Sequence, residues 1–277
     1  MTVTRFAPSP TGLLHTGHAY AAKVAHDLAK ESGGQFLLRF EDIDSTRVRE
    51  EYYEAIEEDL LWLGLEWDDA PLRQSDRLEA YGDALDRLRE LGLVYPCFCT
   101  RREIEEEITR MASAPHGPEG PLYPGTCRAL TLAESHDRIA SGELPAWRLH
   151  ATAAARVTGP LTFSDRRFGS VQVDPTALGD VVLARKDIGT SYHLAVVVDD
   201  AFQKVTRVTR GEDLLASTHI HRMLQSLLEF PEPEYFHHAL ITDEHGQRLA
   251  KRDRSRTIRS LRECGDSPSR IFASFPK

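Results

Sequence analysis

The stretch Thr2–Phe40, TVTRFAPSPTGLLHTGHAYAAKVAHDLAKESGGQFLLRF, decides the expected fold. Residues Thr2–Phe6 alternate in polarity and predict a short strand, which runs into a loop rich in proline and glycine. Gly17–Glu31 predicts a helix that ends at Ser32–Gly34, and Gln35–Phe40 predicts a buried strand. A strand, a glycine-containing loop, a helix and a second strand make a βαβ unit, so the expected fold class is α/β with a parallel sheet.

The rest of the chain divides into segments that differ in residue composition and hydrophobic pattern. Two amphipathic helices are expected around Arg49–Leu63 and Ser75–Leu91. Tyr95–Gly179 contains three of the four cysteines, the stretch SAPHGPEGPLYPGT and short strand-like pieces such as AWRLHA and LTFSD, and it predicts an inserted subdomain. Sheet-like sequence resumes in DVVLARKDIGTSYHLAVVVDDAFQKVTRVTRGEDLL, followed by a helix from about Ser217–Leu228. A polar loop, TDEHGQRLAKRDRSRT, and a basic helix are expected after it.

Composition narrows the class of protein. The 277 residues can bury a sizeable core in one large domain or two smaller ones. No apolar run approaches the ~20 residues of a membrane span, and the N-terminus lacks the layout of a secretory signal. Four cysteines without an export signal predict reduced thiols in the cytoplasm, where metal binding is favoured over disulfides.

Charge is distributed unevenly along the chain. The net charge of −9 argues against passive binding to a polyanion, yet residues 245–277 contain nine Lys/Arg and three Asp/Glu. This basic tail could contact a phosphate backbone locally, or it could be an ordinary solvated helical face. The charge pattern alone favours neither interpretation.

The run His15-Thr16-Gly17-His18 lies between a strand and the start of a helix. Backbone N–H groups and the helix dipole favour an anion at this position. Imidazole donors can bind phosphate oxygens, and Gly17 lets a purine or ribose approach the backbone closely. The run therefore predicts a nucleotide loop, and the alternative is a pair of half-exposed histidines that cap the helix.

Three motifs in one order carry a family resemblance. RFAPSPTGLLHTGH, LLRFEDIDSTR and TRVTRGEDLL resemble blocks of the class I aminoacyl-tRNA synthetases in the form of the glutamate enzymes, and the resemblance spans Arg5 to about Asp253. It implies that His15, Gly17 and His18 bind ATP, with the two histidines acting catalytically at the α-phosphate. The implied plan comprises the first half of a Rossmann-type catalytic domain over residues 1–95, an inserted zinc-containing, acceptor-type subdomain over 96–179, the second half over 180–230, and a lysine-signature loop with a short, basic, helical C-terminal segment over 231–277.

The residue types also suggest an amino-acid pocket. A substrate with an α-ammonium group and an extra carboxylate needs one anion and at least one guanidinium, because arginine pairs a carboxylate through two parallel hydrogen bonds. Arg5 lies at the end of the first predicted strand and Glu41 follows the second, and the carboxyl ends of parallel strands open into one crevice. Glu41 can bind the ammonium and Arg5 a carboxylate, while Tyr192 and Arg210 can complete the contacts.

The resemblance implies that these positions, together with Ala7 and Ser9, bind glutamate. Bland alternatives exist for each residue. Glu41 could belong to a solvated acidic loop with Asp42 and Asp44, Tyr192 could be a core aromatic, and Arg210 could form an internal salt bridge with Asp213.

The segment GQRLAKRD, Gly246–Asp253, resembles the flexible lysine signature that closes over ATP in these enzymes. A mobile lysine can follow pyrophosphate charge through an in-line displacement, which makes Lys251 the candidate for this catalytic and ATP-binding role. Arg248 stands where a lysine is common and Ala250 where a serine is common. These departures put a hydroxyl contact from this loop in doubt, but not the role of the lysine. The alternative to a lysine signature is an ordinary basic linker.

Three cysteines suggest a metal site. Cys97 and Cys99 form a Cys-x-Cys pair, Cys127 follows, and tetrahedral zinc needs a fourth ligand. Tyr123, His116 and His136 are candidates, and ordinary zinc chemistry favours histidine. The resemblance favours Tyr123, because CFC…YPGTC looks like the Cys-x-Cys…Tyr-x-x-x-Cys site of one subgroup of glutamate enzymes. The implied zinc is structural, and the alternative is three unligated buried cysteines.

The chain stops about 24 residues after Asp253, whereas a full glutamyl-tRNA synthetase continues into an anticodon-binding domain. This resembles a truncated subgroup that activates glutamate with ATP and Mg²⁺, without tRNA, to glutamyl-adenylate. The subgroup then transfers glutamate to queuosine at the wobble position of the tRNA(Asp) anticodon stem-loop. The rivals are a glutamate-activating ligase with a small amine acceptor, a catalytically inactive tRNA-binding module and a discriminating glutamyl-tRNA synthetase with a separate anticodon chain. A monomer is expected.

Overall fold

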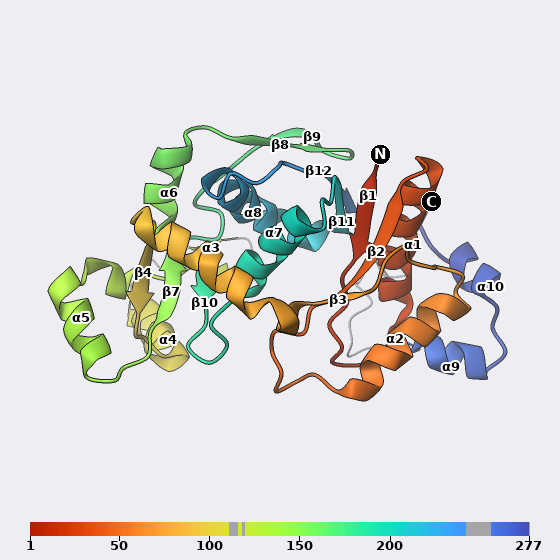
Figure 1. Cartoon of the computed structure of the whole chain (residues 1–277), viewed down its shortest axis with the longest axis horizontal. Helices are drawn as coiled ribbons and strands as arrows, with labels where there is room; N and C mark the ends of the chain where they lie inside the picture. The colour runs from red at the N-terminus through yellow and green to blue at the C-terminus, as the bar shows by residue number, and fades with distance from the viewer. Residues whose placement is uncertain (111–115, 118–119, 242–255, 277) are drawn as a thin grey trace.

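The structure, a computed structural model, describes residues 1–110, 116–117, 120–241 and 256–276 (Figure 1). Its N-terminal part is a βαβ unit made of β1 (Val3–Phe6), α1 (Thr16–Glu31) and β2 (Gln35–Phe40). β1 and β2 pair in parallel, and β3 (Leu72–Arg73) continues the parallel sheet beyond β2. The prediction of an α/β fold with a parallel sheet is confirmed.

The sequence of α1 explains how closely it lies on this sheet. The buried face of α1 consists of alanines that recur every three or four residues: Ala19, Ala22, Ala25 and Ala29. Methyl side chains let a helix approach its neighbours closely while it retains high helix propensity. After α1 the chain turns back through Gly34, where a Cβ atom would lie 1.9 Å from the Thr2 carbonyl oxygen. Only glycine fits that contact, so the connection from helix to strand depends on it.

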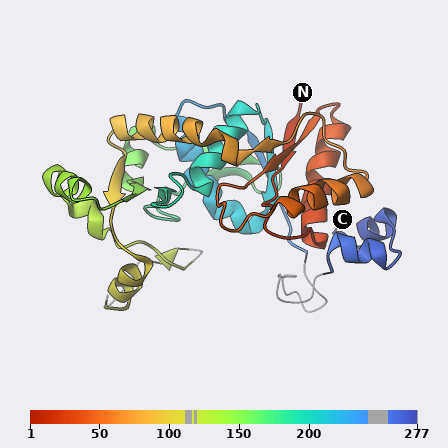
Figure 2. The same ribbon diagram turned by 60° about the horizontal axis from the view of Figure 1, so that its bottom comes forward.

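A separate antiparallel sheet contains strands from the expected insertion and from the residues on either side of it. α2 (Glu50–Trp62), η1 (Gln74–Arg77) and α3 (Leu78–Glu90) lead to the sheet β10-β7-β4, made of β4 (Val94–Cys97), β7 (Ala146–Leu149) and β10 (Val182–Ala184). Around it lie α4 (Arg101–Arg110), β5 (His116–Gly117), β6 (Gly120–Pro121), η2 (Thr126–Ala129), α5 (Leu132–Ala140) and α6 (Ala151–Thr158). Both views place α4 and α5 at the opposite end of the molecule from the C-terminal helices (Figures 1 and 2).

A second, mostly parallel sheet extends the first. It has the order β11-β12-β8-β9, from β11 (Arg207–Gly211), β12 (Glu234–His238), β8 (Thr162–Asp165) and β9 (Gly169–Gln172). The two sheets meet where the Thr206 N–H donates to the Val3 carbonyl at 3.0 Å and the Val3 N–H to Thr206 Oγ1 at 2.9 Å. β8 and β9 fall within residues 96–179 but pair with β12, while β10 falls after residue 179 but pairs with β7. The expected range of the insertion therefore does not coincide with one sheet.

The sheet-like stretch after Asp180 contains a helix, α7 (Tyr192–Phe202), which corrects the sequence-based expectation there. Its residues Leu194 to Asp200 are all buried. α7 packs with α3 and α8 (Leu215–Leu227, after η3, Glu212–Leu214) in one hydrophobic core. A helix surrounded by core has no polar face to reveal a period of 3.6, and burial overrides the strand preference of Val196, Val197 and Val198.

The C-terminal segment returns to the N-terminal unit. α9 (Ile258–Glu263) and α10 (Pro268–Ala273) place Ile258, Leu261 and Ile271 in the same hydrophobic core as Phe6 and Leu14. The Ile258 N–H donates to the Leu14 carbonyl at 2.8 Å, so this segment lies directly against the nucleotide loop. Within the described residues, no helix is both long enough and apolar enough to cross a bilayer.

Candidate active site

Two adjoining cavities open at the carboxyl ends of β1, β2 and β11. The first, of about 420 Å³, is lined by Arg5, Glu41, Tyr192 and Arg210 among others. The second, of about 480 Å³, is lined by the nucleotide loop, including Ser9, Gly12 and His15. Both cavities share the wall formed by Phe6, Ala7 and His18. The structure therefore brings the two groups of expected site residues together at one edge of the sheet, as parallel-sheet topology favours.

Arg5 is buried and is held by a partner that the sequence did not indicate. Its Nε donates to Asp200 Oδ1 at 2.8 Å, its Nη2 to Asp200 Oδ2 at 3.3 Å, and its Nη1 to the Thr209 carbonyl at 3.2 Å. Asp200 lies on α7, 195 positions away in the sequence. Of the five N–H groups of a guanidinium, these three bonds leave two for a ligand.

Arg39 is a further buried guanidinium that sequence reasoning missed. It is 0 % exposed; its Nη1 donates to Asp200 Oδ1 at 2.7 Å, and its Nη2 lies 3.7 Å from Glu41 Oε1. Arg39 Nε and Nη2 have no hydrogen-bond partner among the described residues. An arginine inside the buried strand QFLLRF, two residues before Glu41, was the available signal.

Glu41 lines the first cavity with its side chain 18 % exposed. Burial raises the pKa of its carboxyl, and the nearby guanidinium groups of Arg39 and Arg5 oppose this rise. The carboxylate is thus a partly desolvated anion that faces a cavity, which is the environment in which a cationic ligand gains most from pairing.

Arg210 is buried but surrounded by neutral groups. Its Nη1 lies 3.3 Å from the Tyr192 hydroxyl and 3.1 Å from His221 Nδ1, its Nε donates to His237 Nε2 at 3.2 Å, and its Nη2 donates to the Thr218 hydroxyl. No carboxylate among the described residues forms an ion pair with Arg210, and the alternative of a salt bridge to Asp213 finds no support among them. The first cavity therefore borders the positive charge of Arg210, and the groups that hydrogen-bond this guanidinium are uncharged.

The nucleotide loop combines both interpretations of its histidines. His15 is the N-cap of α1, where its Nδ1 accepts a hydrogen bond from the Gly17 N–H at 3.2 Å. The His15 and His18 rings stack with their centroids 3.7 Å apart. The same rings line the second cavity at the N-terminus of α1, where the helix favours an anion. Lys251, the other expected ATP contact, lies outside the described residues.

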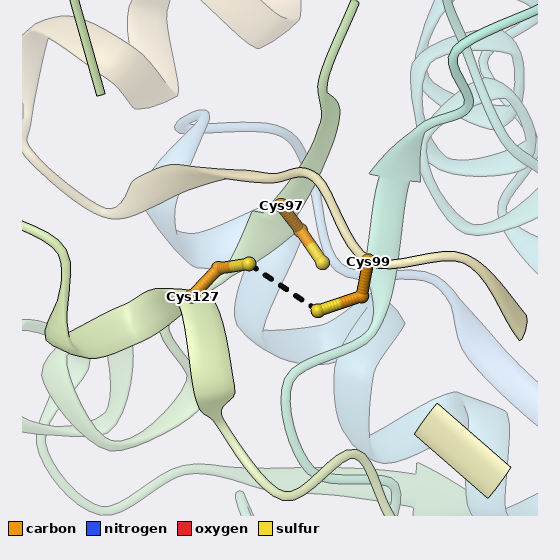
Figure 3. Close-up of side chains that lie close together, drawn as sticks. All are labelled: Cys97, Cys99 and Cys127. Atoms are coloured by element: carbon orange, nitrogen blue, oxygen red, sulfur yellow. Dashed lines mark hydrogen bonds between the residues drawn. The ribbon is translucent and has the colours of Figure 1, made fainter. Parts of the chain in front are cut away.

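The cysteines of the insertion form a compact cluster (Figure 3). The Sγ atoms of Cys97, Cys99 and Cys127 all lie within 4.8 Å of one another. The Tyr123 hydroxyl oxygen is 3.4 Å from Cys97 Sγ and 3.7 Å from Cys99 Sγ, and it accepts a hydrogen bond from the Cys127 N–H. The side chain of His116 is not described. We call the three cysteines and Tyr123 the thiol cluster.

The thiol cluster can hold a metal ion. Three sulfurs around one tetrahedral zinc stand about 3.8 Å apart, which is close to the spacing here. A hydrogen bond from Cys97 lowers the pKa of the Cys127 thiol, which favours the thiolate form that a metal ion binds. His136 is exposed, and although it lines a pocket that also borders Cys127, it is not among the described ligand groups within 4.8 Å of the three sulfurs. The geometry therefore agrees better with Tyr123 than with His136 as a fourth ligand.

Comparisons with known proteins agree on one family. Residues 1–276 match the model of the tRNA synthetases class I (E and Q), catalytic domain. The chain is 51 % identical over 274 residues to the glutamyl-Q tRNA(Asp) synthetase of Rhodobacter capsulatus, covering 97 % of this chain and 98 % of that protein. It is 45 % identical over 271 residues to the protein of the same name from Nitratidesulfovibrio vulgaris, covering 94 % and 81 %.

The solved structures extend this relationship. A glutamate-tRNA synthetase from Elizabethkingia anophelis superposes with a TM-score of 0.78 at 30 % identity, over 91 % of this chain and 53 % of that chain. The present chain thus spans about half the length of that solved enzyme.

Proposed function

Because the chain belongs to the class I tRNA synthetases for glutamate and glutamine and is a ligase of that type, we propose that it activates glutamate with ATP to glutamyl-adenylate. The observation that carries this proposal is the pairing of charges around the first cavity. Glu41 offers an anion for the α-ammonium group, and Arg210 offers a buried cation with no acidic partner among the described residues. A dicarboxylic amino acid matches both.

Each residue then has a defined role in binding. Glu41 pairs with the ammonium group, and the charge of Arg39 opposes the rise in the pKa of that carboxyl that burial causes. Arg210 and Tyr192 receive the distal carboxylate. Arg5, anchored by Asp200, contributes its two remaining N–H groups to the same carboxylate. Ala7 and Ser9 line the second cavity, and their backbone would contact the amino acid where it meets the nucleotide.

Activation needs no covalent enzyme intermediate. An oxygen of the substrate α-carboxylate attacks the α-phosphorus of ATP, the bond to the bridging oxygen breaks, and pyrophosphate leaves with the electron pair. His15, His18 and the N-terminus of α1 stabilise the charge on the α-phosphate, and Lys251 follows the pyrophosphate. Mg²⁺ bound with ATP neutralises phosphate charge. Holding both reactants in adjoining cavities supplies proximity, which is a large part of the rate.

For the second step, we propose transfer of glutamate to queuosine at the wobble position of tRNA(Asp). The support is that two relatives that align over almost the whole chain are glutamyl-Q tRNA(Asp) synthetases by name. The basic tail and the insertion are the expected contacts of the anticodon stem-loop. The thiol cluster would bind a structural zinc ion that fastens the segment around η2 to β4, because its ligands come from both.

Two measurements test these steps separately. Glutamate-dependent ATP–pyrophosphate exchange in the absence of tRNA tests activation, and no exchange at any Mg²⁺ concentration would favour a non-catalytic tRNA-binding module. Labelled glutamate, ATP and bulk tRNA, followed by ribonuclease digestion and mapping of the labelled nucleotide, test transfer. Label at the wobble nucleoside supports the proposal, label at the 3′ terminus supports a glutamyl-tRNA synthetase, and label on a small amine supports the ligase alternative.

A further inference from the structure

Behind Arg210, away from the cavity, lies a buried network that the reaction itself does not use. His221 and His237 are 2 % and 0 % exposed, and neither lines the first cavity. His221 Nε2 lies 3.2 Å from His193 Nδ1, and His237 Nδ1 lies 2.6 Å from Asp165 Oδ2. Both imidazoles turn their other nitrogen toward the guanidinium of Arg210.

The partners fix which nitrogen carries the proton. Asp165 accepts the Nδ1–H of His237, which leaves His237 Nε2 as an acceptor for Arg210 Nε. Thr218 bridges the same two residues, because its hydroxyl oxygen accepts from Arg210 Nη2 and lies 2.9 Å from His237 Nε2. His221 likewise accepts through Nδ1 when its Nε2–H donates to His193. Burial lowers the pKa of His237 to about 4, and burial and Arg210 lower that of His221, so both rings stay neutral.

Two arginines of the first cavity are thus held in opposite ways. Asp200 pairs with Arg5 directly, and it also pairs with Arg39, whereas the groups that hydrogen-bond Arg210 are neutral and the carboxylate of Asp165 is bonded to His237 and not to Arg210 itself. An acidic residue in place of either histidine would hold the guanidinium equally well but would compete with the substrate carboxylate. Neutral acceptors therefore provide orientation without that competition.

We infer that His221 and His237 are positioning residues that orient Arg210 while preserving its charge for the distal carboxylate of the amino acid, and thereby set the preference for a carboxylate over a carboxamide. This inference rests on the proposed activation of glutamate. It assigns the choice between glutamate and glutamine partly to two side chains that touch neither substrate.

The test compares two substitutions of equal shape at one position. Asn in His221→Asn offers a neutral oxygen near the former Nδ1, and Asp in His221→Asp offers a charged one. His221→Asn should keep the KM for glutamate close to the wild-type value. His221→Asp should lower the ratio of kcat/KM for glutamate over glutamine about tenfold, since a charged hydrogen-bond partner exceeds a neutral one by roughly that factor. The KM for ATP should stay unchanged in both.

His219→Asn and His219→Asp provide the matched control on α8. His219 accepts a hydrogen bond from the Asp174 N–H and has no contact with Arg210 among the described residues. This pair should leave the glutamate-to-glutamine ratio unchanged. If His221→Asp does not fold, His237→Gln against His237→Glu repeats the comparison, because their longer side chains reach the position of Nε2.

The outcomes separate the two proposals. Wild-type enzyme without glutamate-dependent exchange overturns the proposed function before any variant is compared. Wild-type exchange with equal selectivity in His221→Asn and His221→Asp overturns the present inference alone. A purely structural role would reduce stability and kcat in both variants and would leave the selectivity ratio unaltered.

Discussion

Asp59 provides a direct test of the electrostatics of this fold. It lies on α2 and is 0 % exposed, and neither carboxylate oxygen has a hydrogen-bond partner among the described residues. Burial raises the pKa of its carboxyl from 3.8 to about 6, although Arg262 and Arg259 pull it down. We predict that Asp59→Asn stabilises the protein at pH 8.

The magnitude follows from the pKa difference. A carboxyl with a raised pKa in the folded state adds stability that is complete below pH 3.8 and is lost as the pH rises through about 6. A shift of about two pH units corresponds to about 3 kcal/mol of cost for the ionised form. Asparagine removes that cost but buries an amide without a partner, at about 1 kcal/mol or more. The expected gain in the free energy of unfolding at pH 8 is therefore about 1–2 kcal/mol.

Urea unfolding at pH 4.5 and pH 8 measures the effect. The variant should gain stability at pH 8 relative to wild type and gain little or nothing at pH 4.5. Glu58→Gln is the control, because Glu58 neighbours Asp59 on α2 but is 57 % exposed and pairs with Arg262 at 3.0 Å. A variant Asp59→Asn that is less stable than wild type at pH 8, or a gain of the same size at both pH values, would refute the reasoning.

Three further predictions concern the proposed site. Glu41→Gln should raise the KM for glutamate about a hundredfold by leaving the substrate ammonium without its anion. Because burial raises the pKa of Glu41, the wild-type KM for glutamate should rise as the pH falls through that pKa. The KM of Glu41→Gln, which has no titrating carboxyl at this position, should not change with pH over the same range. Removing the metal with a chelator, or the substitution Cys127→Ser, should lower the melting temperature. Elemental analysis should find one zinc per chain before the treatment and none after it. A metal-free protein with the same melting temperature would contradict this prediction. Charge reversal at Arg256 and Arg259 should weaken transfer to tRNA and flatten its salt dependence while exchange continues, whereas unchanged transfer kinetics would exclude the tail as an RNA contact.

Local signals explain what the sequence predicts well. β2 was expected at Gln35–Phe40 and occupies those residues, because a short apolar run between turn residues has few alternatives. His15, Gly17 and His18 were expected together at the start of a helix, and they lie at the N-terminus of α1, while their binding of a nucleotide stays a prediction. Features of this kind depend on neighbours in the sequence, so one sequence suffices to find them.

Features that depend on distant partners were not predictable. Nothing near Arg5 indicates that Asp200 will pair with it, since the pair forms only when the folded chain brings α7 to β1. The neutral surroundings of Arg210 likewise come from α8 and β12. α7 itself was missed because a helix buried on all sides shows no amphipathic period. In each case the tertiary packing, and not the local sequence, decides the result.

The wall of Phe6, Ala7 and His18 that both cavities share has a practical consequence for inhibitor design. Under the proposed activation of glutamate, a stable compound that joins an acidic amino acid to a nucleoside through an uncleavable link would occupy both cavities at once. Its second half would bind as an intramolecular event, at an effective concentration of about millimolar or higher, so its affinity should far exceed that of either fragment. Enlarging the side chain at Ala7, which lines both cavities, should penalise such a tethered compound more than either fragment alone.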